Sequence, residues 1–231
     1  MKPSTIAIDG PAASGKSTVA ERVAHQLGYL YLDTGVMYRA VTWAAIQRNV
    51  PLEDEAAVTD LARALHIDVV SPSVDDGRQY TVLTDGVDVT WDIRRPAVDA
   101  NVSLVSTYRG VRAEMVRQQR RVAQGGRIVM VGRDIGSVVL PDADLKIYMD
   151  AAVEERARRR WLELQERSKP MAYDDVLAMM RSRDQIDSQR DISPLCIPAG
   201  AVVFDTTELS AEEVLAQLLA LIERQGCPAD E

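Results

Sequence analysis

Cysteine and histidine are scarce in this sequence, with two of each among 231 residues. The pair Cys196 and Cys227 provides no disulfide framework, and with two histidines it does not suggest a zinc site. No stretch approaches the roughly 18 apolar residues of a membrane span, and the first apolar run, Thr5–Asp9, is too short for a signal peptide. We therefore expect a cytoplasmic protein without a membrane anchor, in which Cys196 is buried as a small apolar residue.

An excess of positive charge is also lacking, because 27 lysines and arginines stand against 35 aspartates and glutamates. The net charge of -8 is the opposite of the balance typical of nucleic-acid-binding proteins, so we do not expect a nucleic-acid partner. Arginines that converge locally can still bind small anions, and the segments Arg156–Arg160 and Arg181–Arg190 are candidates. Nothing in the composition demands an oligomer, and we expect a monomer.

Segments typical of strands and helices alternate along the chain. Short apolar runs predict strands, and apolar residues at helical spacing predict helices. The predicted strands are Thr5–Asp9, Tyr29–Asp33, Arg127–Gly132, Leu145–Asp150 and Ala201–Thr206. The predicted helices are Ser17–Leu27, Met37–Ile46, Arg109–Gln124, Val153–Arg167, Tyr173–Gln185 and a last helix from the capping box Ser210/Glu213 to about Arg224. This alternation indicates a parallel sheet covered by helices.

The segment 66–90 breaks the alternation. Its turn signals, Asp75-Asp76-Gly77 and Asp85-Gly86, separate β-rich runs and predict a small antiparallel insert. Residues 226–231 are predicted to form a flexible tail. With 46% hydrophobic residues, the chain can form one sizeable core, or a core with appended subdomains.

The strongest motif runs from Gly10 to Ser17 and fits G-x-x-x-x-G-K-[ST] at each fixed position. It lies between a predicted strand and a predicted helix, where such a loop points backbone N–H groups at phosphate oxygens. Lys16 is expected to reach the β- and γ-phosphates of ATP, and the Ser17 hydroxyl to bind Mg²⁺. The residues assigned to ATP binding are Gly10, Pro11, Ala12, Ala13, Ser14, Gly15, Lys16, Ser17 and Thr18.

A phosphate loop alone leaves several functions open. The guanine-reading motif Asn-Lys-x-Asp of GTPases is absent from the sequence, and motor or ABC-type ATPases are longer or carry signatures of their own. A short chain with many arginines downstream of the loop favours a small-molecule kinase, because such an enzyme must neutralise both an anionic donor and an anionic acceptor.

Further motifs resemble those of one family, the bacterial cytidylate kinases. They follow one another in the family's order across nearly the whole chain. The segments are Tyr31–Arg39 (YLDTGVMYR), Val131–Val139 (VGRDIGSVV), Pro141–Asp144 (PDAD), Glu154–Arg160 (EERARRR), Arg183–Leu195 (RDQIDSQRDISPL) and Asp205–Ser210 (DTTELS). The resemblance implies transfer of the γ-phosphoryl group of ATP to CMP or dCMP.

The resemblance also implies an architecture. Members of the family fold as a P-loop kinase domain similar to adenylate kinase, with a five-stranded parallel sheet flanked by helices. Carried over to this chain, residues 1–231 form a single domain. It includes a mobile acceptor-binding region at 34–108, which contains the antiparallel insert 66–90, and a short lid at 151–190.

Roles on the acceptor side are implied residue by residue. Guanidinium forks bind phosphate oxygens in pairs, and such a role is implied for Arg39, Arg133 and Arg190 on the α-phosphate of the acceptor. The remaining implied contacts are Arg183 and Asp187 to the ribose, Ser103, Arg112 and Asp134 to the cytosine edge, and Thr34 and Tyr38 to the acceptor.

The transferring phosphoryl group is expected to meet two arginines of the lid, Arg156 and Arg160, whereas Arg158 and Arg159 are left as surface residues. Position 131 is Val where family members usually have an acid near the metal, so Asp33 is the carboxylate expected beside Ser17 at Mg²⁺. The residues predicted to be catalytic are Lys16, Arg133, Arg156, Arg160 and Arg190.

Two alternatives remain at this point. The first is a kinase for another small acceptor, such as UMP or a shikimate-like acid, against which the set Ser103, Arg112 and Asp134 argues. The second is an ATP-gated interaction module without catalysis. Such a module has no use for Arg39, Arg133 and Arg190, so the acceptor-side arginines favour an enzyme.

Overall fold

The computed structural model describes residues 2–166, 168–190 and 192–226. The chain divides into two compact units, one formed by Met1–Leu27 with Val129–Glu231 and the other by Gly28–Ile128. The second unit contains the whole region 34–108 predicted to bind the acceptor. Of the predicted tail, Gly226 ends the last helix and 227–231 lie outside the described residues.

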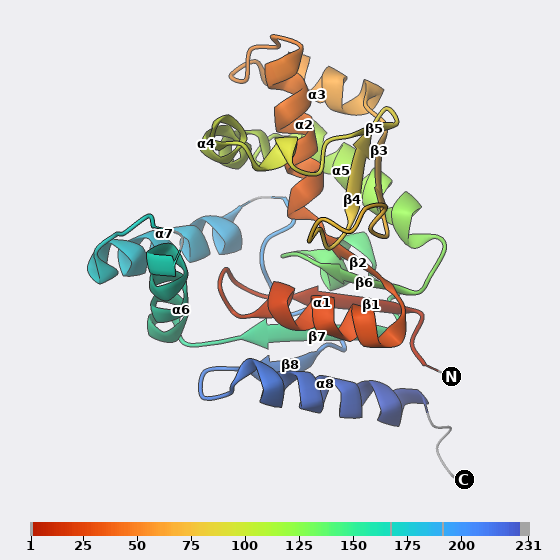
Figure 1. The fold of residues 1–231 in the computed structure, drawn as a ribbon, viewed down its shortest axis with the longest axis vertical. Coiled ribbons are helices and arrows are strands. Elements are labelled where there is room, and N and C mark those ends of the chain that lie inside the picture. Colours follow the sequence, from red (N-terminus) through yellow and green to blue (C-terminus); the bar gives the residue numbers. More distant parts are fainter. Residues whose placement is uncertain (1, 167, 191, 227–231) are drawn as a thin grey trace. The chain divides into compact units, whose positions relative to one another are not determined.

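A five-stranded sheet has the strand order β2-β6-β1-β7-β8, and all of these strands were predicted from the sequence (Figure 1). Its strands are β1 (Thr5–Asp9), β2 (Leu30–Asp33), β6 (Ile128–Val131), β7 (Leu145–Asp150) and β8 (Val202–Asp205). The pairing is parallel, with Ile8 opposite Ile147 and Ile147 opposite Val202. Nearly continuous apolar runs suit this position, because helices cover both faces of a parallel sheet.

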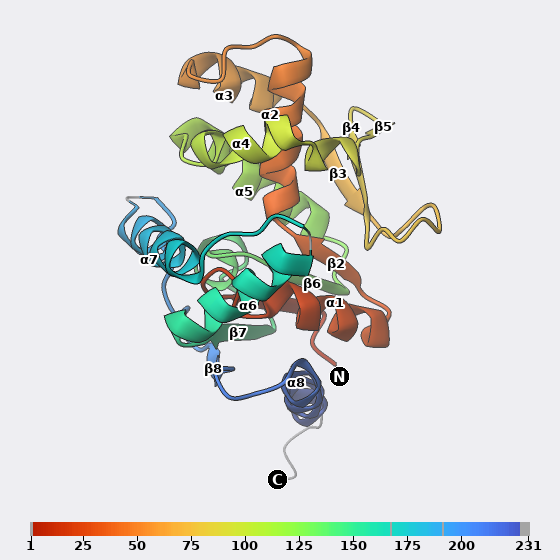
Figure 2. The ribbon, with the colours of Figure 1, turned by 60° about the vertical axis from the view of Figure 1, so that its left-hand side comes forward.

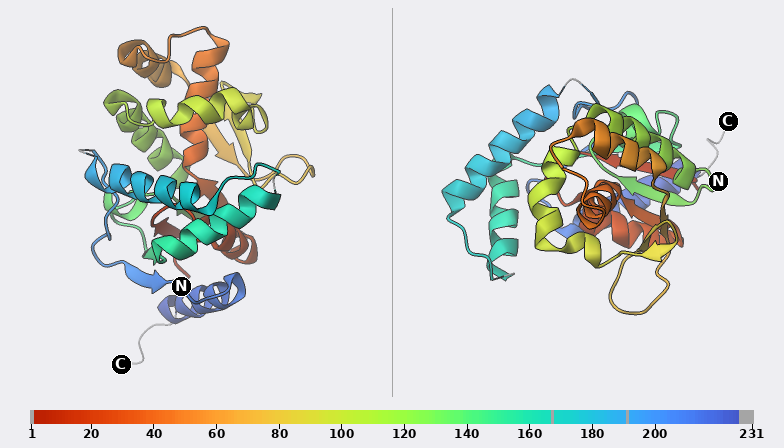
Figure 3. Two further views of the ribbon diagram at one scale, coloured as in Figure 1. Left: turned by 90° about the vertical axis from the view of Figure 1, so that its left-hand side faces the viewer. Right: turned by 90° about the horizontal axis from the view of Figure 1, so that it is seen from above.

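In the described part of the first unit, four helices accompany a π-helical turn η2 (Ile135–Val139). They are α1 (Lys16–Leu27), α6 (Val153–Glu166), α7 (Tyr173–Gln189) and α8 (Ala211–Gly226). The predicted capping box is confirmed, since Ser210 N–H donates to Glu213 Oε2 at 2.8 Å and Glu213 N–H donates to Ser210 Oγ at 3.2 Å. Helix α1 packs against α8, and α6 packs against α7 (Figure 3).

Helix α7 extends one turn beyond the predicted end at Gln185 and stops at Gln189. No glycine or proline interrupts the segment before Pro194, so nothing in it breaks the helix earlier. Two aspartates, Asp184 and Asp187, therefore lie on one face of α7, three residues apart. The expectation that Cys196 is buried is wrong, because this residue, between α7 and β8, is exposed.

The second unit is built around the long helix α2 (Gly35–Gln47), which contacts α3, α4, α5 and β4 (Figure 2). Its other helices are α3 (Glu55–Ala64), α4 (Pro96–Val105), α5 (Arg109–Ala123) and the short 3₁₀ helix η1 (Asp92–Arg94). The predicted antiparallel insert is confirmed as β3 (Ile67–Val70), β4 (Thr81–Thr84) and β5 (Val87–Asp88). Within the described part of the chain, no helix is long and apolar enough to cross a membrane.

Candidate active site

The phosphate loop connects β1 to α1 and depends on its first glycine. Gly10 has φ +145°, and a Cβ atom there would lie 2.0 Å from the carbonyl oxygen of Met149 in β7. Gly15 closes the loop at φ +89°, and Ala13 between them also adopts a left-handed φ of 59°. The loop thus curls tightly against the sheet, as a phosphate cradle of backbone N–H groups requires.

Lys16 opens α1, and its ammonium group is held over this loop. It donates to the carbonyl of Pro11 and to Ser14 Oγ, the latter at 3.1 Å, and the residue is only 5% exposed. Ser17 and Thr18 follow in the first turn of α1 and are exposed. A cation and a helix N-terminus therefore meet at the loop, which is an arrangement that binds anionic phosphate groups.

Asp9, at the end of β1, is a residue of this site that the sequence analysis missed. Its two carboxylate oxygens each accept a backbone N–H, from Ile135 and Gly136, at 2.7 Å. Burial raises the pKa of Asp9 to about 6, although the two hydrogen bonds lower it. The nearby charge of Asp134 adds to the rise. Asp9 thereby fixes the start of the η2 turn directly after Asp134. The sequence did contain a signal for Asp9, because an acidic residue ends the predicted buried strand just before the phosphate loop.

Two arginines predicted for the acceptor phosphate meet at one carboxylate. Arg133 Nε donates to Asp187 Oδ2 at 2.9 Å, and Arg190 Nη1 lies 3.6 Å from Asp187 Oδ1. Arg190 Nε is fixed separately by the carbonyl of Ser193 at 2.7 Å. Arg183, the predicted ribose partner of Asp187, is exposed on α7. The structure thus brings together Arg133, Asp187 and Arg190.

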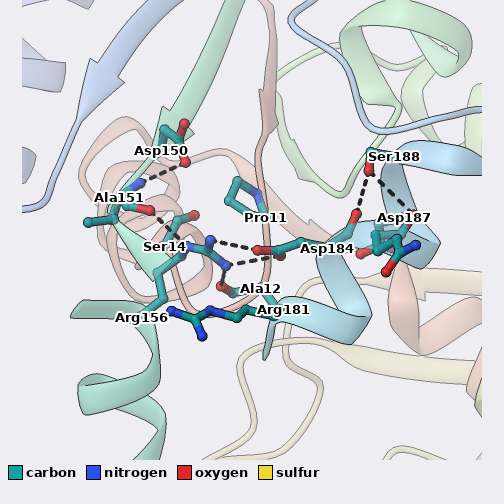
Figure 4. Close-up of polar contacts among 12 residues, drawn as sticks. Pro11, Ala12, Ser14, Asp150, Ala151, Arg156, Arg181, Asp184, Asp187 and Ser188 are labelled. Carbon is teal, nitrogen blue, oxygen red and sulfur yellow. Dashed lines mark hydrogen bonds and ion pairs between the residues drawn. The ribbon is translucent and has the colours of Figure 1, made fainter. Parts of the chain in front are cut away.

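Arg156 reaches the phosphate loop from α6. Its Nε donates to the carbonyl of Ala151 at 2.8 Å, and its Nη1 donates to the carbonyl of Ala12 in the loop at 3.4 Å. The same guanidinium forms a bidentate pair with Asp184 of α7 (Figure 4). Arg160 instead pairs with Glu163 at 2.7 Å on α6 and remains partly exposed.

A cavity of about 460 Å³ opens beside the loop and is lined by Gly15, Thr18, Arg160, Thr206 and other residues. Arg159, expected to be a surface residue, is partly buried and forms part of this wall. Its guanidinium donates to the carbonyl and the hydroxyl of Thr206 and to Glu155. A pocket that borders a phosphate loop can take the base and sugar of a nucleotide.

The second unit carries the other predicted acceptor residues except Asp134. The guanidinium of Arg112 lies over the ring of Tyr38, with its central carbon 5.6 Å from the ring centroid, and donates to the carbonyl of Ser106 at 3.2 Å. Arg39 donates to the carbonyl of Ile93 at 3.1 Å and pairs with Asp99.

Two further predicted acceptor residues, Thr34 and Ser103, and the predicted metal ligand Asp33 also belong to this unit. Thr34 is buried just before α2, and Ser103 is exposed on α4. Asp33 Oδ1 accepts the N–H of Gly35 at 3.0 Å, at the first turn of α2. The predicted cytosine set is thus divided, with Ser103 and Arg112 in one unit and Asp134 in the other.

Comparison with known proteins identifies the family. The family model for cytidylate kinase matches residues 6–224. This chain belongs to the cytidylate kinase family. A cytidylate kinase of Chloroflexus aggregans is 55% identical over 186 residues, covering 80% of this chain and 81% of the relative. One of Herpetosiphon aurantiacus is 47% identical over 220 residues, covering 95% and 94%.

Among solved structures, an uncharacterized protein of Eubacterium ventriosum has a TM-score of 0.53 at 11% identity, covering 94% of this chain and 97% of its own. At this identity the likeness extends to the fold alone. Family membership makes the chain a nucleoside-monophosphate kinase that transfers phosphate from ATP to CMP or dCMP. It also removes a shikimate-like acceptor, one form of the first alternative, and the non-catalytic module.

Proposed function

We propose that this cytidylate kinase divides its reaction between a donor set on the phosphate loop and an acceptor set of arginines. The observation that carries the proposal lies in the first unit. There, Lys16 and Arg156 both contact the phosphate loop, and Arg133 and Arg190 both contact Asp187. A kinase needs such cations because its barrier is lowered chiefly by alignment and charge neutralisation.

On the donor side, the loop residues 10–18 hold the phosphates of ATP, and Lys16 neutralises the β- and γ-phosphates. The cavity beside Gly15 and Thr206 takes the base and sugar of the donor. Among the described residues, no three carboxylates, histidines or cysteines gather as a metal site. This suits Mg²⁺ that arrives on ATP, since Mg²⁺ commonly binds through substrate phosphates and few protein ligands.

The protein ligands proposed for Mg²⁺ are the hydroxyl of Ser17, an exposed residue, and, second, the carboxylate of Asp33. A hydroxyl at the start of α1 and a carboxylate are oxygen donors, which is the chemistry that Mg²⁺ prefers. When bound, the ion would neutralise charge on the phosphate groups during transfer. Ser17 and Lys16 are adjacent in the sequence, so this chain can present a cation and an oxygen ligand to the same phosphates.

On the acceptor side, Arg39, Arg133 and Arg190 hold the α-phosphate of CMP, and Arg183 with Asp187 holds its ribose. Thr34 and Tyr38 contribute further acceptor contacts. For the base, Asp134 accepts from the exocyclic amine of cytosine, whereas Arg112 and Ser103 donate to its O2 and N3 atoms. The pair of Arg112 over Tyr38 supports this role, because stacking fixes the plane of the guanidinium.

The chemical step is an in-line attack by an oxygen of the CMP phosphate on the γ-phosphorus of ATP. The attacking oxygen is already anionic, so no strong general base is needed. The bond from the γ-phosphorus to the bridging oxygen of ADP breaks as the new bond forms. Arg156 and Arg160, from α6, stabilise the charge of the transferring group with Lys16.

The proposed setting is a monomer in the cytoplasm that uses neither nucleic acid nor a membrane. The substrates are small anions, and a net charge of -8 opposes binding of a nucleic acid. A coupled assay of ADP release over a panel of nucleoside monophosphates tests the proposed function. CMP and dCMP should be turned over clearly faster than UMP, and equal use of all of them would overturn the proposal.

A further inference from the structure

The bidentate ion pair between Arg156 and Asp184 joins helices α6 and α7 at the phosphate loop (Figure 4). Asp184 Oδ1 accepts from Nη1 at 3.0 Å and Asp184 Oδ2 accepts from Nη2 at 2.7 Å. The side chain of Arg156 is 6% exposed, whereas that of Asp184 is 28% exposed. The guanidinium of Arg156 is thus buried, whereas the carboxylate of Asp184 that binds it is partly exposed to solvent.

We propose that Asp184 is the positioning residue for Arg156, holding its guanidinium at the phosphate loop in the orientation that phosphoryl transfer requires. This inference rests on the proposed function, in which Arg156 contacts the transferring group. Asp184 itself has no predicted contact with ATP or CMP and acts through Arg156. The carboxylate matters because a guanidinium is a planar fork that one bidentate partner can fix in both position and plane.

The hydrogen bonds of Arg156 leave capacity for a phosphate oxygen. A guanidinium has five N–H donors, and the protein engages four of them, at Ala151, at Ala12 and twice at Asp184. The bond to Ala12 is long, at 3.4 Å, and is therefore readily exchanged for a bond to phosphate. Arg156 can thus meet a phosphate oxygen while Asp184 continues to hold it.

Apolar packing places this ion pair against the loop. Ala12 of the loop belongs to a buried cluster with Ala157 and Leu164 of α6 and Val176 and Met180 of α7. Asp184 lies one turn beyond Met180 on α7, and Arg156 directly precedes Ala157 on α6. The two helices and the loop are therefore packed together where the ion pair forms.

A second ion pair links the same two helices and provides a matched control. Glu154 of α6 and Arg181 of α7 pair at 3.0 Å, with side chains 58% and 60% exposed. This pair ties α6 to α7 without a hydrogen bond to Arg156, on which Glu154 acts only through its charge, so its loss reproduces any effect of a missing tether. An exposed pair contributes little to stability. We therefore expect Glu154→Gln to keep kcat within about twofold of the wild type.

The test measures kcat and the KM values for ATP and CMP in the wild type, Asp184→Asn, Asp184→Glu, Arg156→Ala and the double variant Asp184→Asn/Arg156→Ala. Asp184→Asn should lower kcat roughly tenfold and leave both KM values within about twofold, because the lost orientation matters in the transition state. Asp184→Glu, which restores a carboxylate, should recover part of kcat. In the Arg156→Ala background, Asp184→Asn should cause no further loss, since its effect passes through Arg156.

Three results would overturn the inference: full kcat in Asp184→Asn, a loss equal to that of Glu154→Gln, or additive losses in the double variant. Wild-type turnover in Arg156→Ala would also overturn the inference, because Arg156 would then have no role in phosphoryl transfer. The proposed function is tested separately, by the activity of the wild type on CMP. The inference about Asp184 can therefore fail while the proposed function holds, and the two failures can be told apart. Thermal melts check folding, and Asp184→Ser replaces Asp184→Asn in the same cycle if the latter does not fold.

Discussion

Arg133 and Asp187 form an ion pair in which Nε and Oδ2 lie 2.9 Å apart. The sequence motifs placed them in different roles, with Arg133 at the acceptor phosphate and Asp187 at the ribose. The structure adds a direct link between them, with Arg190 approaching the other oxygen of the same carboxylate. Because like charges repel, two guanidinium groups are held near one another more easily with a carboxylate between them.

Replacing either arginine should chiefly weaken acceptor binding. Arg133→Ala and Arg190→Ala each remove a cation assigned to the CMP phosphate, and the expected loss of CMP binding free energy is roughly 2–5 kcal/mol. Neither arginine is assigned to the phosphate loop, so ATP affinity should be retained. Calorimetric titration of ATP and CMP separately measures both effects. Lost ATP affinity with intact CMP affinity would reverse the assignment of the two sides.

The sheet was predictable because its strands are short apolar runs between clear breakers. Helices α3 and α4 were missed, although Asp54 caps α3 by accepting the N–H of Ala57 and Pro96 begins α4. Their packing against α5 and α2 comes from the fold of the second unit, which local patterns do not reveal.

For the site, the sequence motifs predicted the arginines but not the residues with which they form hydrogen bonds and ion pairs. The pairing of Arg156 with Asp184 brings together residues 28 positions apart. The hydrogen bond that the N–H of Gly136 donates to the carboxylate of Asp9 spans 127 positions. Contacts of this kind depend on how the strands and helices pack, so spacing in the sequence cannot give them. The residue types were visible, whereas the geometry that joins them was not.

Lys16→Ala should abolish most turnover while the protein still folds. Removing one preorganised charge from the transition state lowers kcat on the order of a hundredfold or more. Steady-state kinetics with ATP and CMP measures the loss, and a thermal melt verifies folding. The buried ammonium donates to Pro11 and Ser14, so Lys16→Met, which keeps the apolar stem, is a useful control for packing. Near-normal kcat in a folded variant would remove the role of Lys16.

Gly10→Ala should destabilise the protein strongly. A methyl group there would lie 2.0 Å from the carbonyl oxygen of Met149, and the φ of +145° is unfavourable for any L side chain. We expect a loss of about 3 kcal/mol or more in the free energy of unfolding, measured by urea denaturation. Gly125→Ala is the matched control, because nothing lies within 4 Å of a Cβ atom at that position. Equal stability of the two variants would contradict the tight contact of the loop with β7.

Asp9 should make stability fall as pH rises. Its pKa is raised from 3.8 to about 6 in the folded protein, so the folded state binds the proton more tightly than the unfolded state between these values. The contribution of Asp9 to stability is therefore greatest below pH 4 and is lost as pH rises through 6. The charged groups that face it are Asp134, which raises its pKa, and Lys16, which lowers it.

Urea denaturation of the wild type and Asp9→Asn from pH 4.5 to pH 7.5 isolates this effect. The variant cannot titrate at position 9, so it does not lose the stability that Asp9 loses as pH rises. Over this range, the unfolding free energy of the wild type should therefore fall by about 2 kcal/mol relative to that of Asp9→Asn. The comparison cancels the other titrating groups that the two proteins share. A constant difference across the range would show that Asp9 does not titrate there.

The role proposed for Asp134 provides the last prediction, since cytosine and uracil differ at one position of the edge assigned to this residue. Cytosine has an amine donor at position 4, and uracil has an acceptor oxygen there. A carboxylate accepts hydrogen bonds and cannot donate while ionised. Asp134 is buried directly before the η2 turn, and the carboxylate of Asp9 fixes the first two N–H groups of that turn. The backbone that carries Asp134 is therefore held in place by Asp9.

Asp134→Asn should narrow the preference for CMP over UMP, because an amide can donate to the oxygen of uracil. A buried polar group rejects a substrate that leaves it unpaired, by up to about 10⁴–10⁵ in favourable cases. The measurement is kcat/KM for CMP and for UMP in the wild type and in Asp134→Asn. In the wild type, kcat/KM should be clearly higher for CMP than for UMP. In Asp134→Asn, the ratio of the two values should fall. An unchanged ratio would remove Asp134 from the base-reading role, even if the variant lost activity on both substrates.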